Sequence, residues 1–346
     1  MALSSPESPA PPRRVFINRV ENPTEEHEEL NKMAHGVIAE SRSEDVFSSY
    51  VCHSLLNHKG IQCHPGDIVE AGCLAAQQLP AAKYGLFESL PQDLVETGKL
   101  SDLQLEGVLY ACQRHQMVLA NGQRAGFFIG DGAGVGKGRQ ISGIVLDNFA
   151  RGRCRHVWFS ISTDLKLDAQ RDLHDIGCYV KVIVVASSLI KRQGTNRQSR
   201  LQQLIDWCGG EQFNGCLIFD ECHKAKHFVP FDTHLIIHYD YPNIAGSFQK
   251  LVLSYCSATG VTDVKNMAFM ERLGLWGDGT AFKSFDSFLT SITKRGLGAA
   301  EMLAMEMKAS GMYVSRGLSF RQAEFVNVEA PLTESQIKVY DTAVHV

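Results

Sequence analysis

Short apolar runs alternate with amphipathic stretches through the middle of the chain. In the amphipathic stretches apolar residues recur at helical spacing, as at Leu105, Val108, Leu109 and Cys112. Apolar runs of a few residues between helices are typical of strands buried on both faces of a parallel sheet. The pattern therefore predicts an α/β fold with a mainly parallel sheet. The predicted strands cover residues 125–129, 156–161, 180–186, 216–219 and 251–254.

Both ends of the chain differ from this central pattern. Residues 1–40 are Ser/Pro-rich and then acidic, which predicts a largely disordered segment. Residues 41–100 are punctuated by His, Gly and Pro and predict an irregular extension packed on the core. We expect the core lobe at residues 101–262 and a mostly helical extension at residues 263–346.

The composition narrows the class of protein. Hydrophobic residues make up 44% of the chain and charged residues 21%, which excludes a fibrous or mostly disordered protein. The net charge of -4 provides no general positive field, so any nucleic-acid contact must come from local basic patches. No apolar run approaches the roughly 20 residues that span a bilayer, so no membrane partner is expected. Ten Cys without a secretory signal favour reduced thiols in the cytosol or nucleus.

Cysteine spacing gives little support to a zinc site. No two of the ten Cys form a C-x-x-C pair. The densest group is Cys52, His53, His58, Cys63 and His64, whose spacing fits no zinc ribbon or finger. We therefore expect surface histidines and partly buried thiols there.

The clearest motif is GDGAGVGKGR at residues 130–139. It follows an apolar strand and precedes a helix-like stretch, the context that a phosphate-binding loop requires. Its glycines allow backbone N–H groups to face phosphate oxygens, and Lys137 would reach the β- and γ-phosphates. The predicted nucleotide-binding residues here are Asp131, Gly132, Ala133, Gly134, Val135, Gly136, Lys137, Gly138 and Arg139.

This loop departs from the usual G-x-x-x-x-G-K-[ST] pattern at both ends. Asp131 stands where the first glycine is expected. Gly138 stands where a Ser or Thr hydroxyl normally ligates Mg²⁺. A glycine-rich turn that binds no ligand is therefore the alternative interpretation.

A second motif, NGCLIFDECHK, places two carboxylates at the carboxyl end of a predicted strand. Ligands of open α/β sheets bind at that edge. Asp220 can hold Mg²⁺ directly or through water, and Glu221 can orient or deprotonate the attacking water. His223 is placed to contact the γ-phosphate side or a neighbouring motif. The alternative is a solvated acidic turn.

A third motif, Ser257-Ala258-Thr259, directly follows the last predicted strand. Small hydroxyl residues at a strand end can bond the acidic box and sense the γ-phosphate. The triplet alone carries no information. Its place after the phosphate loop and the D-E-C-H box makes chance an unconvincing explanation.

These three motifs resemble motifs I, II and III of superfamily 2 DExD/H helicases, and their flanking segments resemble the strawberry notch family. The resemblance covers about residues 64–346 and includes LSDLQLEGVLYACQRHQ, DLKLDAQRDLHDIG, FDECHKAK, NMAFMERLGLWGDGT and GMYVSRGLSF. It implies a RecA-like P-loop NTPase lobe that uses ATP and Mg²⁺. That family also carries Gly after the loop lysine, so Mg²⁺ would depend on Asp220 and water.

The resemblance also assigns roles outside the three motifs. Gln104 stands where a helicase glutamine reads adenine, although it could equally be a helix-surface residue. Asp164, Lys166 and Arg171 stand where such proteins meet a nucleic-acid backbone, and the alternative is a solvated helix face. Members of the family act in the nucleus as transcriptional co-regulators. The resemblance therefore implies transcription factors, co-repressors or chromatin as partners.

The chain departs from the family in three places. The connection into residues 187–190 is short, and residues 227–250 do not look like the family, which predicts an irregular loop. No Q-x-x-G-R-x-x-R pattern of a second RecA-like lobe occurs, so the resemblance implies truncation after the first lobe. Because arginine fingers contribute roughly 10³ to 10⁵ in rate, we expect weak nucleotide binding and poor hydrolysis, which leaves the enzymatic status open.

Two functions remain in competition. The first is the ATP-binding lobe of a strawberry notch-like, helicase-related protein acting in transcription. The second is a non-enzymatic scaffold for chromatin or transcription factors with a vestigial ATP site. A small-molecule kinase suits the D-E-C-H and Ser-Ala-Thr motifs less well. Local DNA contacts, or alternatively solvated loops, are expected at Arg151, Arg153, Arg155, Lys191, Arg192, Arg197 and Arg200.

Overall fold

The computed structural model describes residues 47–52, 55, 60–160, 165–186, 200–225, 250–258, 264–321, 326 and 331–344. The chain divides into two units, Met1–Ser48 and Ser49–Val346, and the first is described only at Phe47 and Ser48. The predicted disorder of residues 1–40 therefore lies outside the described residues. The same holds for residues 187–190 and for nearly all of the segment 227–250.

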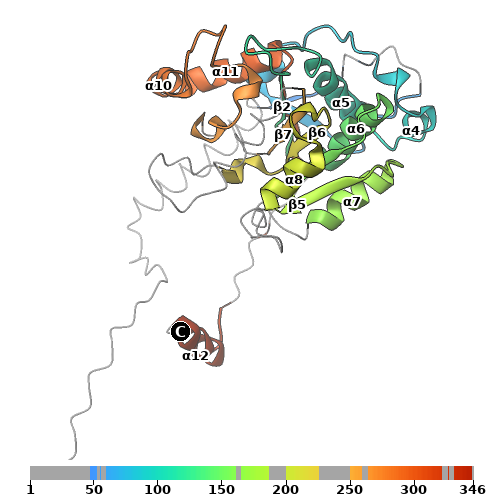
Figure 1. Cartoon of the computed structure of the whole chain (residues 1–346). Helices are drawn as coiled ribbons and strands as arrows, with labels where there is room; N and C mark the ends of the chain where they lie inside the picture. The colour runs from blue at the N-terminus through green and yellow to red at the C-terminus, as the bar shows by residue number, and fades with distance from the viewer. Residues whose placement is uncertain are drawn as a thin grey trace, which may run out of the picture. The chain divides into compact units, whose positions relative to one another are not determined.

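A six-stranded parallel sheet forms the centre of the second unit, with strand order β5-β4-β6-β7-β3-β8. Figure 1 shows β5, β6 and β7 of this sheet, with α6, α7 and α8 around them. Every neighbouring pair in it is parallel. Five of the strands confirm the five apolar runs of the sequence, and the predicted α/β fold is confirmed with them. The strands are β3 (Phe127–Ile129), β4 (His156–Ser160), β5 (Val182–Ala186), β6 (Cys216–Phe219), β7 (Val252–Cys256) and β8 (Tyr313–Val314).

The strand order positions the motifs relative to one another. β7 lies between β3, which leads into the glycine-rich loop, and β6, which leads into the acidic box. This is the RecA-like arrangement. Because the strands are parallel, the glycine-rich loop, the acidic box and the Ser-Ala-Thr segment all follow carboxyl ends at one edge of the sheet.

Helices cover both faces of this sheet. The helices in the described residues are α3 (Gly72–Ala75), α4 (Gln92–Glu96), α5 (Asp102–Arg114), α6 (Lys137–Ala150), α7 (Leu165–Asp175), α8 (Arg200–Cys208), α10 (Phe285–Arg295), α11 (Leu297–Ala309) and α12 (Glu334–Val344). Short 3-10 helices span Leu86–Glu88, Gly210–Gln212, Cys222–Ala225, Val264–Met267 and Glu271–Leu273. None of these helices is long and apolar enough to cross a bilayer.

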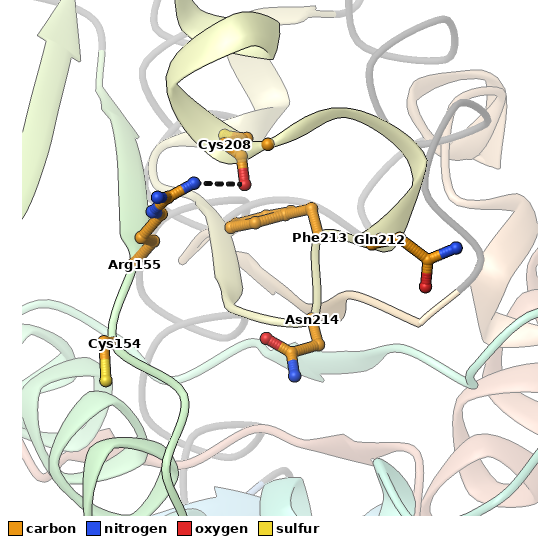
Figure 2. A pocket seen from close by; sticks show the side chains of 7 residues that line it. Cys154, Arg155, Cys208, Gln212, Phe213 and Asn214 are labelled. Atoms are coloured by element: carbon orange, nitrogen blue, oxygen red, sulfur yellow. Dashed lines mark hydrogen bonds between the residues drawn. The ribbon is translucent and has the colours of Figure 1, made fainter.

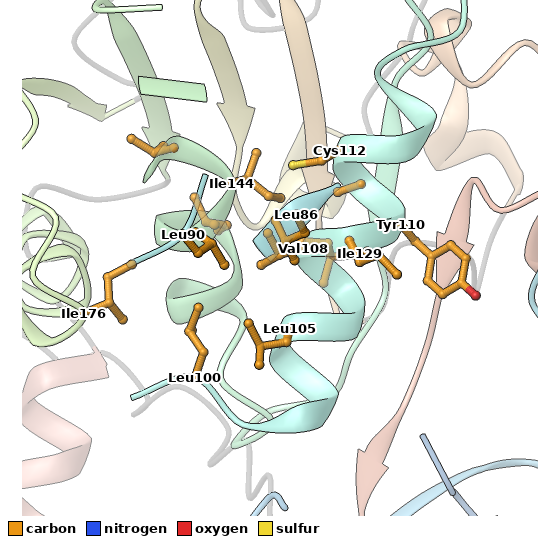
Figure 3. Packing of buried hydrophobic residues seen from close by; sticks show 14 of the residues in the cluster. Leu86, Leu90, Leu100, Leu105, Val108, Tyr110, Cys112, Ile129, Ile144 and Ile176 are labelled. Carbon is orange, nitrogen blue, oxygen red and sulfur yellow. The ribbon is translucent and has the colours of Figure 1, made fainter. Parts of the chain in front are cut away.

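Alternating strand residues divide the core into two clusters. Phe159 of β4 and Phe219 of β6 face a cluster with α8, α10 and α11. Trp158 and Ile218, each one residue earlier, face the opposite cluster with α5, α6 and α7. Figure 3 shows this second cluster, in which side chains of α5 pack against α6 and Ile129 of β3. Complete burial of such side chains contributes roughly 1.5–3 kcal/mol each.

The C-terminal part differs in detail from the predicted helical extension. α10, α11 and α12 confirm its helices, but β8 and β9 (Gly317–Leu318) were not predicted. β8 extends the main sheet beside β3, and β9 pairs antiparallel with β2 (Ile68–Ala71). β1 (Phe47–Ser49) is the remaining short strand. A strand of two residues carries no readable alternation, which explains why the pattern missed it. The domain limits at residues 100 and 262 stay predictions.

Candidate functional site

The glycine-rich loop lies between β3 and the first residue of α6, Lys137. Gly134 and Gly136 have φ values of 84° and 91°, the left-handed region that favours glycine. A Cβ at Gly136 would also overlap the amide of Gln104. The loop conformation therefore requires glycine at these positions, and it exposes Ala133 and Gly134. Backbone N–H groups in such a turn, together with the N-terminus of α6, are suited to bind phosphate oxygens.

Gln104, in the first turn of α5, hydrogen-bonds to the glycine-rich loop. Its Nε2 donates to the carbonyl oxygen of Val135 at 3.1 Å, and its Oε1 accepts from Ser101 N at 3.2 Å. Ser101 and Gln104 form the capping box that begins α5. The side chain is buried, and both ends of its amide contact protein. In this structure Gln104 thus positions the loop, and its predicted contact with adenine stays a prediction.

Lys137 begins α6 and hydrogen-bonds back to the glycine-rich loop. Its Nζ donates to the loop carbonyls of Asp131 and Gly132 at 3.1 and 3.4 Å. Lys137 follows β3 and Asp220 follows β6, so both residues lie at the carboxyl edge of the sheet. The structure thereby brings together the lysine and the aspartate that the sequence assigned to phosphate and Mg²⁺.

Asp131 has a different position from the other loop residues. Its carboxylate is fully buried and accepts from Nε and Nη2 of Arg316 at 3.0 and 2.7 Å. Gln140 Nε2 donates to it at 2.8 Å. Gly132 N also donates to Arg316 O at 2.6 Å, which continues the pairing of β3 with β8. Asp131 therefore fixes the entrance of the loop, and its side chain faces away from the phosphate cradle.

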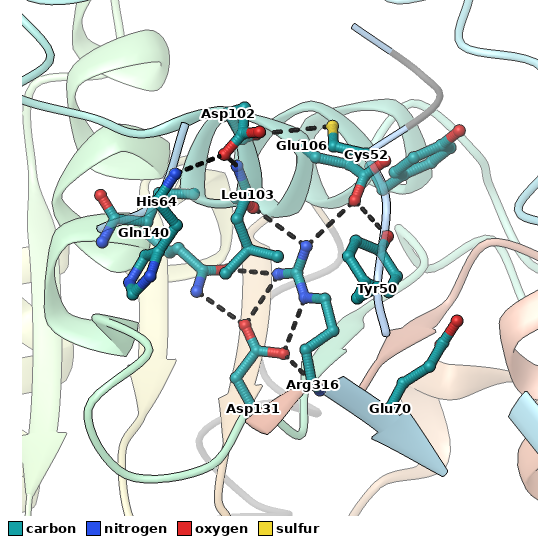
Figure 4. Close-up of polar contacts among 12 residues, drawn as sticks. Tyr50, Cys52, His64, Glu70, Asp102, Leu103, Glu106, Asp131, Gln140 and Arg316 are labelled. Carbon is teal, nitrogen blue, oxygen red and sulfur yellow. Dashed lines mark hydrogen bonds and ion pairs between the residues drawn. The ribbon is translucent and has the colours of Figure 1, made fainter. Parts of the chain in front are cut away.

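Arg316 is the centre of a buried polar network (Figure 4). Its Nη1 donates to Leu103 O at 3.0 Å and to Glu106 Oε2 at 3.1 Å, and Tyr50 Oη donates to the same carboxylate. Burial lowers the pKa of Arg316, but Asp131 more than offsets this and raises it above the usual value. The network joins β8, the loop and α5, and sequence reasoning missed it. Its one signal was an arginine in the short segment GMYVSRGLSF.

The end of the loop faces α7. A Cβ on residue 138 would overlap Asp172 Oδ2 and come within 2.8 Å of Asp172 Cγ. The Ser or Thr of the usual pattern therefore does not fit unless Asp172 moves. Arg139 forms an exposed ion pair with Asp175 at 3.3 Å. Such a pair contributes at most about 1 kcal/mol.

The acidic box begins where β6 ends. Asp220 Oδ1 accepts from Glu221 N at 3.0 Å, and Oδ2 accepts from Trp158 Nε1 at 3.3 Å. Burial, and then the charge of Glu221, raise the pKa of Asp220 to about 6. Glu221 has φ 49° and is the one positive-φ residue other than glycine among the described residues. Strain of this kind clusters at functional sites.

His223 links the acidic box to the third motif. Its Nδ1 lies 2.8 Å from Ser257 Oγ and 3.2 Å from Glu221 Oε2. Ser257 N donates to Ile129 O at 3.0 Å, at the end of the strand that leads into the loop. Ala258 follows at the surface, and Thr259 lies outside the described residues. The predicted proximity of the motifs is present, while their roles in coupling stay predictions.

These groups fit a Mg²⁺–nucleotide better than a protein-only metal cage. Among the described residues no three His, Cys, Asp or Glu side chains gather as a metal site. Mg²⁺ usually takes one or two carboxylates and completes its shell with phosphates and water. Asp220 at the carboxyl edge of the sheet fits that limited protein contribution. Of the Cys/His group, His53 and His58 lie outside the described part of the chain, and His64 Nδ1 accepts from Gly66 N at 3.1 Å.

Three of the predicted basic residues, Arg151, Arg153 and Arg155, lie at the opposite, amino edge of the sheet. Arg151 pairs with Asp147 at 3.2 Å, and Arg153 donates to Asn148 at 2.8 Å. Arg155 Nη1 donates to the last carbonyls of α8, at Trp207 and Cys208, beside a cavity of about 290 Å³ (Figure 2). These cations therefore stabilise helix ends. Lys191, Arg192 and Arg197 lie outside the described residues, and Arg200 begins α8.

α7 carries the remaining basic candidates. Arg171 is exposed and pairs with Asp168 at 2.9 Å. Lys166 is exposed in the first turn, and Asp164 lies outside the described residues. Both cations follow β4 on the carboxyl side of the sheet, so they lie nearer to the loop's edge than the amino-edge arginines do.

Comparison with known proteins agrees with this geometry. A family model described as P-loop containing NTP hydrolase pore-1 matches residues 63–191 and 182–342. Protein FORGETTER 1 of Arabidopsis thaliana is 45% identical over 304 residues, covering 80% of this chain and 23% of that protein. Protein strawberry notch of Drosophila melanogaster is 42% identical over 317 residues, covering 81% and 19%. Protein strawberry notch homolog 2 of Homo sapiens is 44% identical over 305 residues, covering 81% and 21%.

The chain spans 19–23% of the length of these three relatives. Two solved structures from Sulfolobus solfataricus are also similar, each at 14% sequence identity. The SWI2/SNF2 ATPase core domain has a TM-score of 0.46 and covers 78% of this chain and 54% of that chain. The same core in complex with dsDNA has a TM-score of 0.44 and covers 62% and 43%.

Proposed function

The chain belongs to the family of P-loop containing NTP hydrolases and is a relative of the strawberry notch proteins, and from this premise we propose that it is an ATP-binding lobe acting in the regulation of transcription. The observation that carries the proposal is the convergence of Lys137, Asp220 and the His223–Ser257 pair at one sheet edge. The glycine-rich loop, the acidic box and the segment at Ser257 are far apart in the sequence, and they meet at this edge.

Each group has a distinct role in this proposal. The N–H groups of residues 133–138 bind phosphate oxygens, and Lys137 moves from the loop carbonyls to the β- and γ-phosphates. Asp220 would hold Mg²⁺, directly or through water. When bound, Mg²⁺ neutralises charge on the phosphates. Glu221 orients the attacking water. His223, which contacts both Glu221 and Ser257, couples the position of that water to Ser257.

The wider biology is proposed from the resemblance to strawberry notch proteins. We place the protein in the nucleus, with transcription factors, co-repressors or chromatin as partners. DNA contact is proposed for Lys166 and Arg171 on α7, on the carboxyl side of the sheet.

A nucleotide titration tests the proposal. Calorimetry with ATP and excess Mg²⁺ is expected to show saturable binding to the wild type. Lys137→Ala is expected to weaken binding at least about tenfold, or about 1.4 kcal/mol. Lys181→Ala removes an exposed lysine at the amino edge and is expected to bind like the wild type. Equal, negligible affinity in the wild type and Lys137→Ala would overturn the proposal and favour the scaffold alternative.

Hydrolysis is tested separately. Measurable ATP turnover by the chain alone that Glu221→Gln abolishes would contradict the expectation of slow hydrolysis. It would also show that Glu221 acts on the attacking water.

A further inference from the structure

Asp172 occupies the space that the usual phosphate-loop sequence gives to a hydroxyl group. In the usual loop, the residue after the lysine is Ser or Thr, whose oxygen ligates Mg²⁺. Here that residue is Gly138, and the region that its side chain would fill contains Oδ2 of Asp172. The oxygen is the atom of Asp172 that lies nearest to this position, since Cγ is 2.8 Å and Cβ 3.4 Å from it. The loop thus lacks its own oxygen at this place, and another element supplies one.

The fold holds Asp172 in this position through α7. Ala169 and Leu173 of that helix are buried in the core cluster shared with α6. Asp172 lies between them in sequence, and its side chain is 22% exposed. The other two carboxylates of this helix, Asp168 and Asp175, are 50% and 38% exposed and pair with arginines. Asp172 is therefore the carboxylate of α7 that packs against the loop.

The electrostatic surroundings of Asp172 leave its charge poorly compensated. Arg171 lies 4.0 Å from Oδ1, and within the described part of the chain no donor hydrogen-bonds to Oδ2. Burial raises the pKa of Asp172, since the charged form loses water, and the charges of Arg171 and Arg139 offset this only in part. A carboxylate beside a phosphate loop also repels a nucleotide. A divalent cation between the two would convert this repulsion into attraction.

We propose that Asp172 takes the place of the missing hydroxyl and positions the Mg²⁺ of a bound Mg²⁺–nucleotide, directly or through one water. This inference rests on the proposed function, because it assumes that the loop binds nucleotide. It also explains why residue 138 is glycine, and not only why the loop can lack its own hydroxyl ligand. The smallest residue leaves room for an oxygen from α7.

The gain in nucleotide affinity that Mg²⁺ produces, called here the Mg²⁺ increment, tests this role. A fluorescent ATP analogue is titrated against the wild type and Asp172→Asn, once in excess Mg²⁺ and once in EDTA. The wild type is expected to bind more tightly with Mg²⁺. Asp172→Asn is expected to lose roughly 10–100-fold of that Mg²⁺ increment, the usual loss when a group that orients a metal is removed. In EDTA the variant should bind at least as tightly as the wild type, since it no longer repels phosphate.

Two further variants separate this role from simple packing. Asp168→Asn changes an exposed carboxylate on the same helix and should keep the wild-type Mg²⁺ increment. Gly138→Ser combined with Asp172→Ala restores a loop hydroxyl and should recover the increment that Asp172→Ala loses. Mn²⁺ paramagnetic resonance with the nucleotide present gives a readout of the ion that does not depend on hydrolysis.

The outcomes are distinguishable. An unchanged Mg²⁺ increment in Asp172→Asn overturns the inference and leaves nucleotide binding intact. Equal weakening with Mg²⁺ and with EDTA also overturns it, because it indicates that Asp172 only supports the loop. No binding by the wild type in either buffer overturns the proposed function and this inference together.

Discussion

The two edges of the main sheet use their charged residues differently. At the amino edge, Arg151 and Arg153 pair with side chains of α6, and Arg155 caps the carbonyls of α8. At the carboxyl edge, Lys137 donates to two carbonyls of the loop, and Glu221 has a strained backbone. The comparison shows that clustered charge is a poor sign of a binding site. A better sign of a binding site is a charged side chain that lies near a strained backbone, a carboxyl group of raised pKa and free backbone N–H groups.

The largest expected effect lies beneath the carboxyl edge, at Arg316. Arg316→Met would leave Asp131 and Glu106 buried without their cation. Removing one partner of a buried pair costs about 3–5 kcal/mol, which urea denaturation would measure as a lower free energy of unfolding. Arg139→Met, which breaks an exposed pair, should cost less than about 1 kcal/mol. Similar small losses in both variants would contradict a stabilising role for the buried network.

The next effect concerns two buried histidines at the amino side of the sheet. His156 begins β4, and His115 Nε2 contacts Leu253 O at 2.9 Å. Burial lowers the pKa of His115 to about 3 and that of His156 to about 4. Unfolding frees each to protonate near its ordinary pKa of about 6.5, so the stability that they contribute is present above that pH and is lost as pH falls.

Denaturation at pH 7.5 and pH 5.0 checks this effect. The free energy of unfolding is expected to fall by up to about 2 kcal/mol for each of the two histidines. His156→Asn should remove its share of the fall, whereas His174→Gln, at an exposed position, should not. A pH-independent stability over this range would show that these histidines are hydrated in the folded chain.

The smallest expected effect is at the amino-edge arginines themselves. Arg151→Gln with Arg155→Gln should change the affinity for a short DNA duplex by no more than about twofold, because both cations already bond to the chain. Lys166→Gln with Arg171→Gln should weaken binding and lower the slope of log affinity against log salt by about 2. Fluorescence anisotropy over a salt series measures both. Loss of DNA binding in the amino-edge variant alone would reverse the comparison.

Much of this architecture could be predicted from local sequence. The five apolar runs predicted strands because a strand that is buried on both faces has no polar positions. The predicted bounds of β6 match the structure residue for residue. The motifs at Lys137, Asp220 and Ser257 converge because each follows a parallel strand. Local patterns specify both features.

The unpredicted features depend on contacts between distant segments. Arg316 and Asp131 are 185 residues apart, and no local pattern couples them. No local pattern indicates that Asp172 of α7 packs against Gly138, because the two residues belong to different helices. The departures of the loop from the usual pattern therefore have structural causes that only the fold shows.

Hydrogen exchange with and without a non-hydrolysable ATP analogue and Mg²⁺ tests the central claim most directly. The account predicts slower exchange at residues 131–139 and 219–223, with no change at residues 151–156 and 208–214. Protection confined to the amino edge, or no protection anywhere while the fold stays intact, would contradict the assignment of the carboxyl edge as the nucleotide site.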